Sequence, residues 1–195
     1  MILPIVAYGD PVLRKVGIEI DKDYPQLKEL IANMKETMYK ASGVGLAAPQ
    51  IGKAIRLFLV DASPFGEDEE LPEEERAFLA GFNHVFINPK ILKEEGDEWA
   101  FNEGCLSIPD VREDVFRQEQ ITIEFLDEKF EKHTMTLNGL AARVFQHEFD
   151  HIDGILFTDK LSSLKKRLIK KKLENISKGK VTADYRMRFP KPKKK

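Results

Sequence analysis

The chain alternates between stretches in which apolar residues recur at every third or fourth position and stretches in which they recur at every second position. The first helical stretch carries Leu27, Leu30, Ile31, Met34 and Met38. This spacing predicts a helix with one buried face, which ends at Ser42-Gly43. Pro25 in the first turn and Asp23 as a cap mark the expected start.

Two more helices are predicted in the second half of the chain. Residues 137–151 place Leu140, Val144, His147 and His151 at spacings of four, three and four. Both histidines therefore continue a stripe that faces the protein interior. Beyond Gly154, a last helix should be capped by Thr158 and should bury four leucines: Leu161, Leu164, Leu168 and Leu173.

Alternation of apolar and polar residues predicts strands between these helices. Residues 55–61 place Leu57 and Leu59 on one face and Phe58 and Val60 on the other, so both faces should be covered. Further strands are expected at residues 84–92, 98–101, 121–125 and 129–137. The order of elements predicts an α+β fold, with mixed or antiparallel sheets packed around a central helix that carries the two histidines, and a C-terminal helix.

Composition agrees with a globular domain. The 195 residues are 42% hydrophobic and 33% charged, and no apolar run approaches the roughly 20 residues that span a bilayer. Residues 1–6 contain Pro4 and lack a basic region, so we expect no secretory signal, no membrane and a cytoplasmic location. Cys105 is the single cysteine, which excludes an intramolecular disulfide.

Charge is distributed unevenly along the chain. Residues 165–195 hold 14 lysines or arginines against two acids, a net charge of +12, which leaves −14 for residues 1–164. We therefore expect a catalytic domain over 1–164 and a basic extension over 165–195. The extension should be a solvated helix followed by an unstructured end from residue 189, with contact to a polyanion such as RNA as the alternative.

An acidic insertion is expected at about residues 63–81. Residues 67–75 contain seven acids around Leu71-Pro72. Such a composition cannot bury itself, so we expect a solvated loop, with a turn of helix at residues 77–82.

The candidate chemistry centres on an H-E-x-x-H motif in the helix at 137–151. His147 and His151 lie four residues apart on one helical face and can share a divalent ion, with Glu148 between them. A catalytic site needs a third protein ligand and an open position for water. Cys105 is the candidate, on a loop after a strand that ends near Asn102, where Gly104 permits an unusual turn. The two other histidines, His84 and His133, should be ordinary polar residues.

Each of these features also has a purely structural interpretation. An H-E-x-x-H motif occurs by chance in structural helices, and a lone cysteine is often a small buried hydrophobe. Residues 43–52 contain small side chains and Pro49, which composition alone interprets as a tight, non-helical linker between a helix and a strand. Their bare backbone would let another chain approach.

Three separated stretches, residues 43–50, 103–107 and 146–151, together resemble the three motifs of the peptide deformylases, in the family's order and at compatible intervals. The resemblance extends from about Gly9 to about Leu161. It leaves out the acidic insertion and the basic tail. It implies a metal-dependent hydrolase that removes the formyl group from the N-formylmethionine of newly synthesised polypeptides and releases formate.

The resemblance also implies roles for individual residues. Three positions match the family's metal ligands: Cys105, His147 and His151. Glu148 matches the catalytic acid and base, while the Gln50 side chain and the Leu106 backbone N–H match the donors to the oxyanion. In the family the ion is generally Fe²⁺, with zinc, nickel or cobalt able to replace it. The ligand set by itself would suit zinc as readily.

For the substrate, the resemblance implies that Val44 and Gly45 pair with an incoming peptide as an extra strand. The methionine pocket would be formed at or beside four positions: Val44, Phe101, Leu140 and Val144. Arg112 matches a position near the substrate mouth. Arg117 would pair with Glu103, and Asp150 would support the ligands from outside. The expected partners are N-formylmethionyl nascent peptides and, through the basic tail, the ribosome surface.

Two alternatives stay open at this point. An H-E-x-x-H motif alone also suggests a metallopeptidase that cuts internal amides, although a Cys105 thiolate would give the ion more charge than a third histidine or a carboxylate. The other alternative is a non-catalytic binding protein with a structural metal and an RNA-binding tail. A closed structural site should offer four protein ligands, and the sequence offers three.

Overall fold

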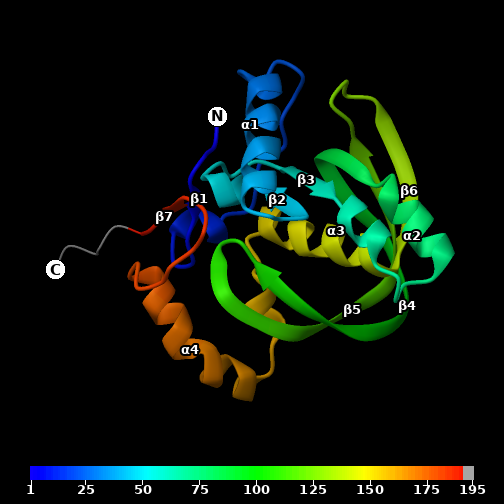
Figure 1. The fold of residues 1–195 in the computed structure, drawn as a ribbon. Helices are drawn as coiled ribbons and strands as arrows, with labels where there is room; N and C mark the ends of the chain where they lie inside the picture. Colours follow the sequence, from blue (N-terminus) through cyan, green and yellow to red (C-terminus); the bar gives the residue numbers. More distant parts are fainter. Residues whose placement is uncertain (191–195) are drawn as a thin grey trace.

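A five-stranded antiparallel sheet lies between two helices in the computed structural model, which describes residues 1–190 (Figure 1). The strand order is β2-β3-β4-β5-β6, with every neighbouring pair antiparallel. The strands are β2 Gly45–Ala47, β3 Leu57–Asp61, β4 Asn83–Cys105, β5 Ile108–Leu126 and β6 Lys132–Asn138. The predicted α+β class is confirmed.

Strand β3 divides the interior into two layers. Phe58 and Val60 point into a cluster shared with the motif helix, α3 (Gly139–Ile152), whereas Leu57 and Leu59 point into a cluster shared with α1 (Leu27–Lys40). Both faces of this strand are covered, as its alternating pattern predicts. The described residues contain no helix that is long and apolar enough to cross a membrane.

The predicted start of α1 is wrong, because Pro25 and Asp23 precede the helix and do not cap it. The chain turns at Gln26, whose φ of 56° is left-handed, and the helix begins at Leu27.

In residues 43–52 the prediction that Pro49 prevents helix is also wrong. Residues Ala48–Ile51 form a short 3-10 helix with Pro49 near its start, where a missing N–H costs nothing. The edge strand β2 precedes it.

The two predicted strands at residues 84–92 and 98–101 belong to one strand, β4, and Cys105 is its last residue rather than part of a loop. With β5 it forms a long hairpin that curves from the sheet toward the C-terminal helix (Figure 1). The register shifts four times along this pair, between Ile87 and Cys105. Bulges interrupt the two-residue period, which is why the sequence pattern showed only the ends of the strand.

Most of the acidic insertion is helical, which corrects the expected loop; the turn of helix expected at residues 77–82 is the end of a longer helix. A 3-10 helix spans Ser63–Glu67, and α2 spans Glu73–Ala80 with three glutamates in its first turn. Acidic side chains at a helix N-terminus are favoured by the helix dipole. Glu75 also reaches the motif helix, where one of its carboxylate oxygens accepts the Leu140 N–H over 3.0 Å.

The C-terminal helix, α4, spans Ser163–Ser177 and is capped by Ser162, not by Thr158. Thr158 lies in a separate 3-10 turn, Phe157–Lys160. The buried face of α4 consists of Ile169, Leu173 and Ile176. Two of the leucines predicted to be buried, Leu164 and Leu168, are 64% and 69% exposed.

Residues 181–190 fold back onto the rest of the chain, so the prediction of an unstructured end from residue 189 is wrong for residues 189 and 190. The short strand β7 (Met187–Arg188) pairs in parallel with β1 (Ile5–Val6). Phe189 packs on a third apolar cluster, which joins β1, the β4–β5 hairpin and α4. Residues 191–195 lie outside the described part of the chain.

Candidate active site

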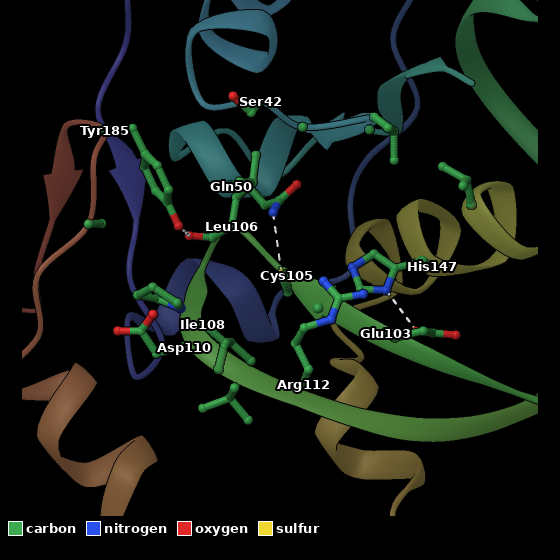
Figure 2. A pocket seen from close by; sticks show the side chains of 18 of the residues that line it. Ser42, Gln50, Glu103, Cys105, Leu106, Ile108, Asp110, Arg112, His147 and Tyr185 are labelled. Atoms are coloured by element: carbon green, nitrogen blue, oxygen red, sulfur yellow. Dashed lines mark hydrogen bonds and ion pairs between the residues drawn. The ribbon is translucent and has the colours of Figure 1, made fainter. Parts of the chain in front are cut away.

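Cys105, His147 and His151 converge although the cysteine and the first histidine lie 42 positions apart in the sequence. One donor atom from each lies within 4.8 Å of the others, and Cys105 Sγ is 3.3 Å from His151 Nε2. The two histidines lie four residues apart on one face of α3. Cys105 closes β4, and Figure 2 labels it together with His147. A thiolate and two imidazoles form a three-donor set for a transition-metal cation.

A buried carboxylate, Glu103, orients His147. Its Oε2 atom lies 2.9 Å from His147 Nδ1, which leaves Nε2 as the ring atom for a ligand (Figure 2). Arg117 donates to both oxygens of Glu103, over 2.6 and 2.9 Å, and to Asp150 over 2.7 Å. Arg117 is therefore a buried residue that links β4 and β5 to the motif helix, not a surface arginine.

The charges around these three donor side chains favour a cation. Burial lowers the pKa of His147, but its hydrogen bonds with Cys105 and Glu103 outweigh burial and raise this pKa to about 10. Burial and the charge of His147 hold the pKa of His151 well below its ordinary value. The environment between Cys105 and Glu103 thus stabilises positive charge, which a bound divalent ion would supply.

Glu148 lies beside this group with a free carboxylate oxygen. Within residues 1–190, its buried Oε2 atom has no hydrogen-bond partner, and the same is true of His151 Nδ1. Burial raises the pKa of Glu148 to about 7, against the opposing charge of His147. A carboxyl group of this kind can both accept and release a proton near neutral pH.

Gly45 makes the position of Glu148 sterically accessible. A Cβ atom at residue 45 would lie far inside van der Waals contact with Glu148 Oε1. Because β2 presents only a glycine here, the carboxylate can pack directly against the backbone of the edge strand. The glycine of the first motif (residues 43–50) therefore makes room for the glutamate of the third motif (residues 146–151).

Gln50 points its amide nitrogen at Cys105, one of the three donor side chains. The Ala47 N–H donates to Gln50 Oε1 over 2.8 Å, which fixes the orientation of the amide. The NH₂ group then faces Cys105 Sγ at 3.5 Å and Ser107 Oγ at 3.4 Å. Leu106 follows the cysteine in the tight turn between β4 and β5, so its N–H belongs to the same turn as the thiol (Figure 2).

A cavity of about 570 Å³ opens beside these groups, a volume that suits a peptide side chain and its backbone. Five of the six residues predicted to bind substrate line it: Val44, Gly45, Phe101, Arg112 and Val144. Leu140 instead lines a neighbouring cavity of about 450 Å³, which Phe101 shares. Gly104 is not in a left-handed conformation; its small size makes room for Arg112, whose Nη1 atom would lie 2.6 Å from a Cβ there.

Sequence reasoning missed Arg143, which is 2% exposed and lines the cavity. Its guanidinium donates to Glu103 Oε1 over 3.1 Å and to the Trp99 carbonyl over 2.6 Å, and it lies 4.4 Å from the centre of the Trp99 ring. The signal was present, because α3 carries Ala141, Ala142 and Phe145 outside the predicted stripe. A helix that is apolar all round is buried all round, together with any arginine on it.

The C-terminal segment was also missed as part of the site. The cavity is also lined by four consecutive residues of this segment: Thr182, Ala183, Asp184 and Tyr185. The Tyr185 hydroxyl donates to the Leu106 carbonyl over 2.7 Å. Nothing in the lysine-rich sequence around it indicates this position.

A second group of candidate metal donors lies at the turn between β5 and β6. Asp127, Glu131 and His133 each offer an atom within 4.8 Å of the others. Asp127 already accepts the backbone N–H groups of Lys129 and Glu131 and pairs with His133, which accounts for the cluster as a turn.

Comparison with known proteins gives one consistent result. Residues 2–167 match the family described as Polypeptide deformylase. The chain is 68% identical over 194 residues to a peptide deformylase of Christiangramia forsetii, covering 100% of this chain and 99% of that protein. A relative from Flavobacterium johnsoniae, also described as a peptide deformylase, is 65% identical over 194 residues, with the same coverage.

Solved structures agree with this result. The crystal structure of peptide deformylase from Thermus thermophilus superposes with a TM-score of 0.78 at 40% identity, covering 92% of this chain and 99% of that one. A peptide deformylase from Legionella pneumophila gives 0.77 at 37% identity, covering 92% and 98%. The chain therefore belongs to the peptide deformylase family, the metal-dependent hydrolases that remove the formyl group from the N-terminus of nascent polypeptides.

Proposed function

We propose that this chain holds its single catalytic cation with Cys105, His147 and His151, and that the cation in the cell is Fe²⁺, with zinc, nickel or cobalt as substitutes. The observation that carries this proposal is the convergence of the three donors beside the buried carboxylate of Glu148. Thiolate and imidazole are donors that suit iron and zinc alike. Three protein ligands leave a coordination position for solvent or substrate.

When bound, such a cation lowers the pKa of a coordinated water and polarises a carbonyl oxygen. Glu148 carries the proton transfers. Its free Oε2 atom accepts the proton of the attacking water, and the same carboxyl group then protonates the departing amine. The raised pKa of Glu148, about 7, supports this double role because neither protonation state is strongly disfavoured.

Gln50 and Leu106 stabilise the negative charge that develops on the formyl oxygen. The Gln50 amide is held by the Ala47 N–H so that its NH₂ group faces the reacting centre. The Leu106 N–H supplies the second donor from the turn that carries Cys105. Removing one donor of this kind costs about 2.7 to 4 kcal/mol of transition-state stabilisation.

The substrate is the N-formylmethionyl end of a nascent peptide. Strand β2 lies at the edge of the five-stranded sheet, so Val44 and Gly45 can pair with an extended peptide as one more strand. Val44, Phe101 and Val144 line the cavity that receives the methionine side chain. Arg112 lies at its mouth, with its guanidinium bonded to Asn102.

The rival activity, cleavage of internal amides, is disfavoured by Cys105, because a thiolate gives the ion more charge than a third histidine or a carboxylate would. The match of residues 2–167 to the Polypeptide deformylase family also favours removal of a formyl group. The non-catalytic alternative is disfavoured by Glu148, because a buried carboxylate without a partner is costly in a site that has no use for it.

We further propose that the enzyme works in the cytoplasm, at the ribosome, and that α4 contributes to this contact. The outward face of α4 presents lysines around exposed Leu164 and Leu168. Such a surface binds polyanions in a salt-dependent manner. Cosedimentation with ribosomes should weaken as salt is raised and should decrease when Lys170, Lys171 and Lys172 are changed to glutamate; salt-independent binding, or none, would contradict the proposal.

The central test is an assay on protein prepared without oxygen and analysed for metal. We expect one divalent ion per chain and release of formate from a formyl-methionyl tripeptide, with no cleavage of the unformylated peptide. Glu148→Gln should keep the metal and lose about 10²- to 10⁴-fold in kcat. Cys105→Ala should lose metal. Cleavage of internal bonds, or full activity of Glu148→Gln, would overturn the proposed function.

A further inference from the structure

The C-terminal segment Val181–Arg188 forms part of the active-site cavity although it lies beyond the part of the chain that matches the family, residues 2–167. Four consecutive residues of this segment, 182–185, line the cavity. Figure 2 shows the Tyr185 side chain reaching from this segment to Leu106, next to Gln50 and Cys105. The segment is thus built into the wall that faces the reacting groups.

The turn that carries Cys105 and Leu106 is held from both ends of the chain. Because a carbonyl only accepts, the Tyr185 hydroxyl is the donor in its 2.7 Å bond with the Leu106 carbonyl. The backbone N–H of Tyr8 donates to the carbonyl of the next residue, Ser107, over 2.8 Å. Two successive carbonyls of the turn are therefore each held by a donor from a distant segment.

These two donors belong to one rigid element. Tyr8 follows β1 and Tyr185 precedes β7, and the two strands pair in parallel. The pairing includes Ile5 N–H to the Arg186 carbonyl at 2.8 Å and Ala7 N–H to the Arg188 carbonyl at 2.9 Å. The ladder fixes the spacing between Tyr8 and Tyr185, so it fixes where the Leu106–Ser107 backbone can lie.

We propose that Tyr185 is a positioning residue for catalysis: its hydroxyl holds the Leu106 carbonyl, and so sets the direction in which the Leu106 N–H points toward the formyl oxygen. The Leu106 N–H and carbonyl belong to two successive planar peptide units that are joined at the Leu106 Cα atom. Cys105 pairs with Ile108 across the turn, so once the Leu106 carbonyl is held the first peptide unit has little freedom left to rotate. Oxyanion donors act only when they are aimed at the position that the charge will occupy. The inference rests on the proposed role of Leu106.

The test compares Tyr185→Phe with Tyr39→Phe in the metal-loaded enzyme. The control also removes a hydroxyl that donates over 2.7 Å, to Asp61, but Tyr39 does not line the cavity. For Tyr185→Phe we expect kcat to fall by about 10-fold with KM, metal content and thermal unfolding unchanged, since a misplaced group slows the chemical step without unfolding the protein. Tyr39→Phe should retain wild-type kcat.

Two inhibitors separate positioning from a general structural role. A peptidyl hydroxamate places an oxygen where the oxyanion forms, whereas a peptidyl thiol reaches the metal through sulfur and places no oxygen there. Tyr185→Phe should lower the affinity for the hydroxamate by about 10-fold and leave the affinity for the thiol unchanged. Equal weakening of both inhibitors, or a wild-type kcat, would overturn the positioning role.

The outcomes also distinguish this inference from the function it rests on. If Gln50→Ala leaves hydroxamate affinity unchanged, or the wild type releases no formate, the oxyanion site itself has been misassigned. If Gln50→Ala weakens the hydroxamate while Tyr185→Phe does not, the oxyanion site stands and the role of Tyr185 is wrong.

Discussion

The Oε2 atom of Glu103 lies 2.9 Å from Nδ1 of His147, and the same carboxylate is the partner of two buried arginines, Arg117 and Arg143. One carboxylate thus orients a proposed metal ligand and pairs with two cations that have little contact with solvent, with Asp150 as the second carboxylate beside Arg117. The site and the stability of the fold depend on the same side chain.

Glu103→Gln should therefore reduce both stability and metal binding. Removing one partner of a buried ion pair costs about 3 to 5 kcal/mol, and losing the support of a metal ligand lowers affinity about 10- to 100-fold. Urea unfolding of the apoprotein and metal titration measure the two effects separately. The exposed pair of Lys93 and Glu95 provides the control, because Glu95→Gln should leave stability nearly unchanged. Equal effects of the two substitutions would contradict this interpretation.

Gly45→Ala should inactivate the enzyme without unfolding it. The new Cβ would clash with Glu148 Oε1, so the carboxylate must move away from its place beside the ligands. A displacement of about 1 Å costs on the order of 10²-fold in rate. Gly81→Ala is the matched control, since the nearest atom to its new Cβ is 3.9 Å away. Wild-type kcat in Gly45→Ala would show that Glu148 has room to adjust.

Glu75→Ala should destabilise the protein through the start of the motif helix. Glu75 Oε1 accepts the Leu140 N–H, and loss of such a cap costs about 0.5 to 2 kcal/mol. Glu74→Ala, on the exposed side of the same first turn of α2, should have little effect. Thermal unfolding of the two variants side by side measures the difference, and equal midpoints would argue against a role for the acidic insertion in holding α3.

Asp61→Asn should make the free energy of unfolding depend less on pH in the acid range. Burial raises the pKa of Asp61, but hydrogen bonds from Ser63 and Tyr39 outweigh it and lower the pKa below its ordinary value. A lowered pKa means that the stabilisation is present above the ordinary value and is lost as pH falls through the folded-state value. Urea unfolding measured from pH 6 to about pH 2.5 should thus show a smaller fall in the free energy of unfolding for the variant than for the wild type. Parallel curves would contradict the assignment.

The layered core and the motif helix could be predicted because local pattern and tertiary packing agree there. Leu57 and Phe58 face opposite layers, as their alternation indicates, and His147 and His151 continue the buried stripe of α3. The α+β class and the family followed from these elements and the three motifs.

The remaining errors occur where packing overrides the local period. Bulges hide most of β4 from a two-residue pattern, and Leu164 looks buried by spacing although α4 turns Ile169 and Leu173 inward. Contacts between distant segments left no local trace: Glu75 meets Leu140, and Tyr185 meets Leu106, 79 residues away in sequence. The spacing of apolar and polar residues within one segment does not show which distant segment will contact it.

The parallel pairing of β1 with β7 has a consequence for how the molecule is made. Residues 5 and 187 must meet before the ladder exists, so translation has to pass residue 187 first. Loops of this length close late, because their entropy is lost before the distant contact stabilises them. A growing polypeptide of this sequence consequently leaves its cysteine-bearing turn unsecured until residues 185–188 have been made and can pair with β1.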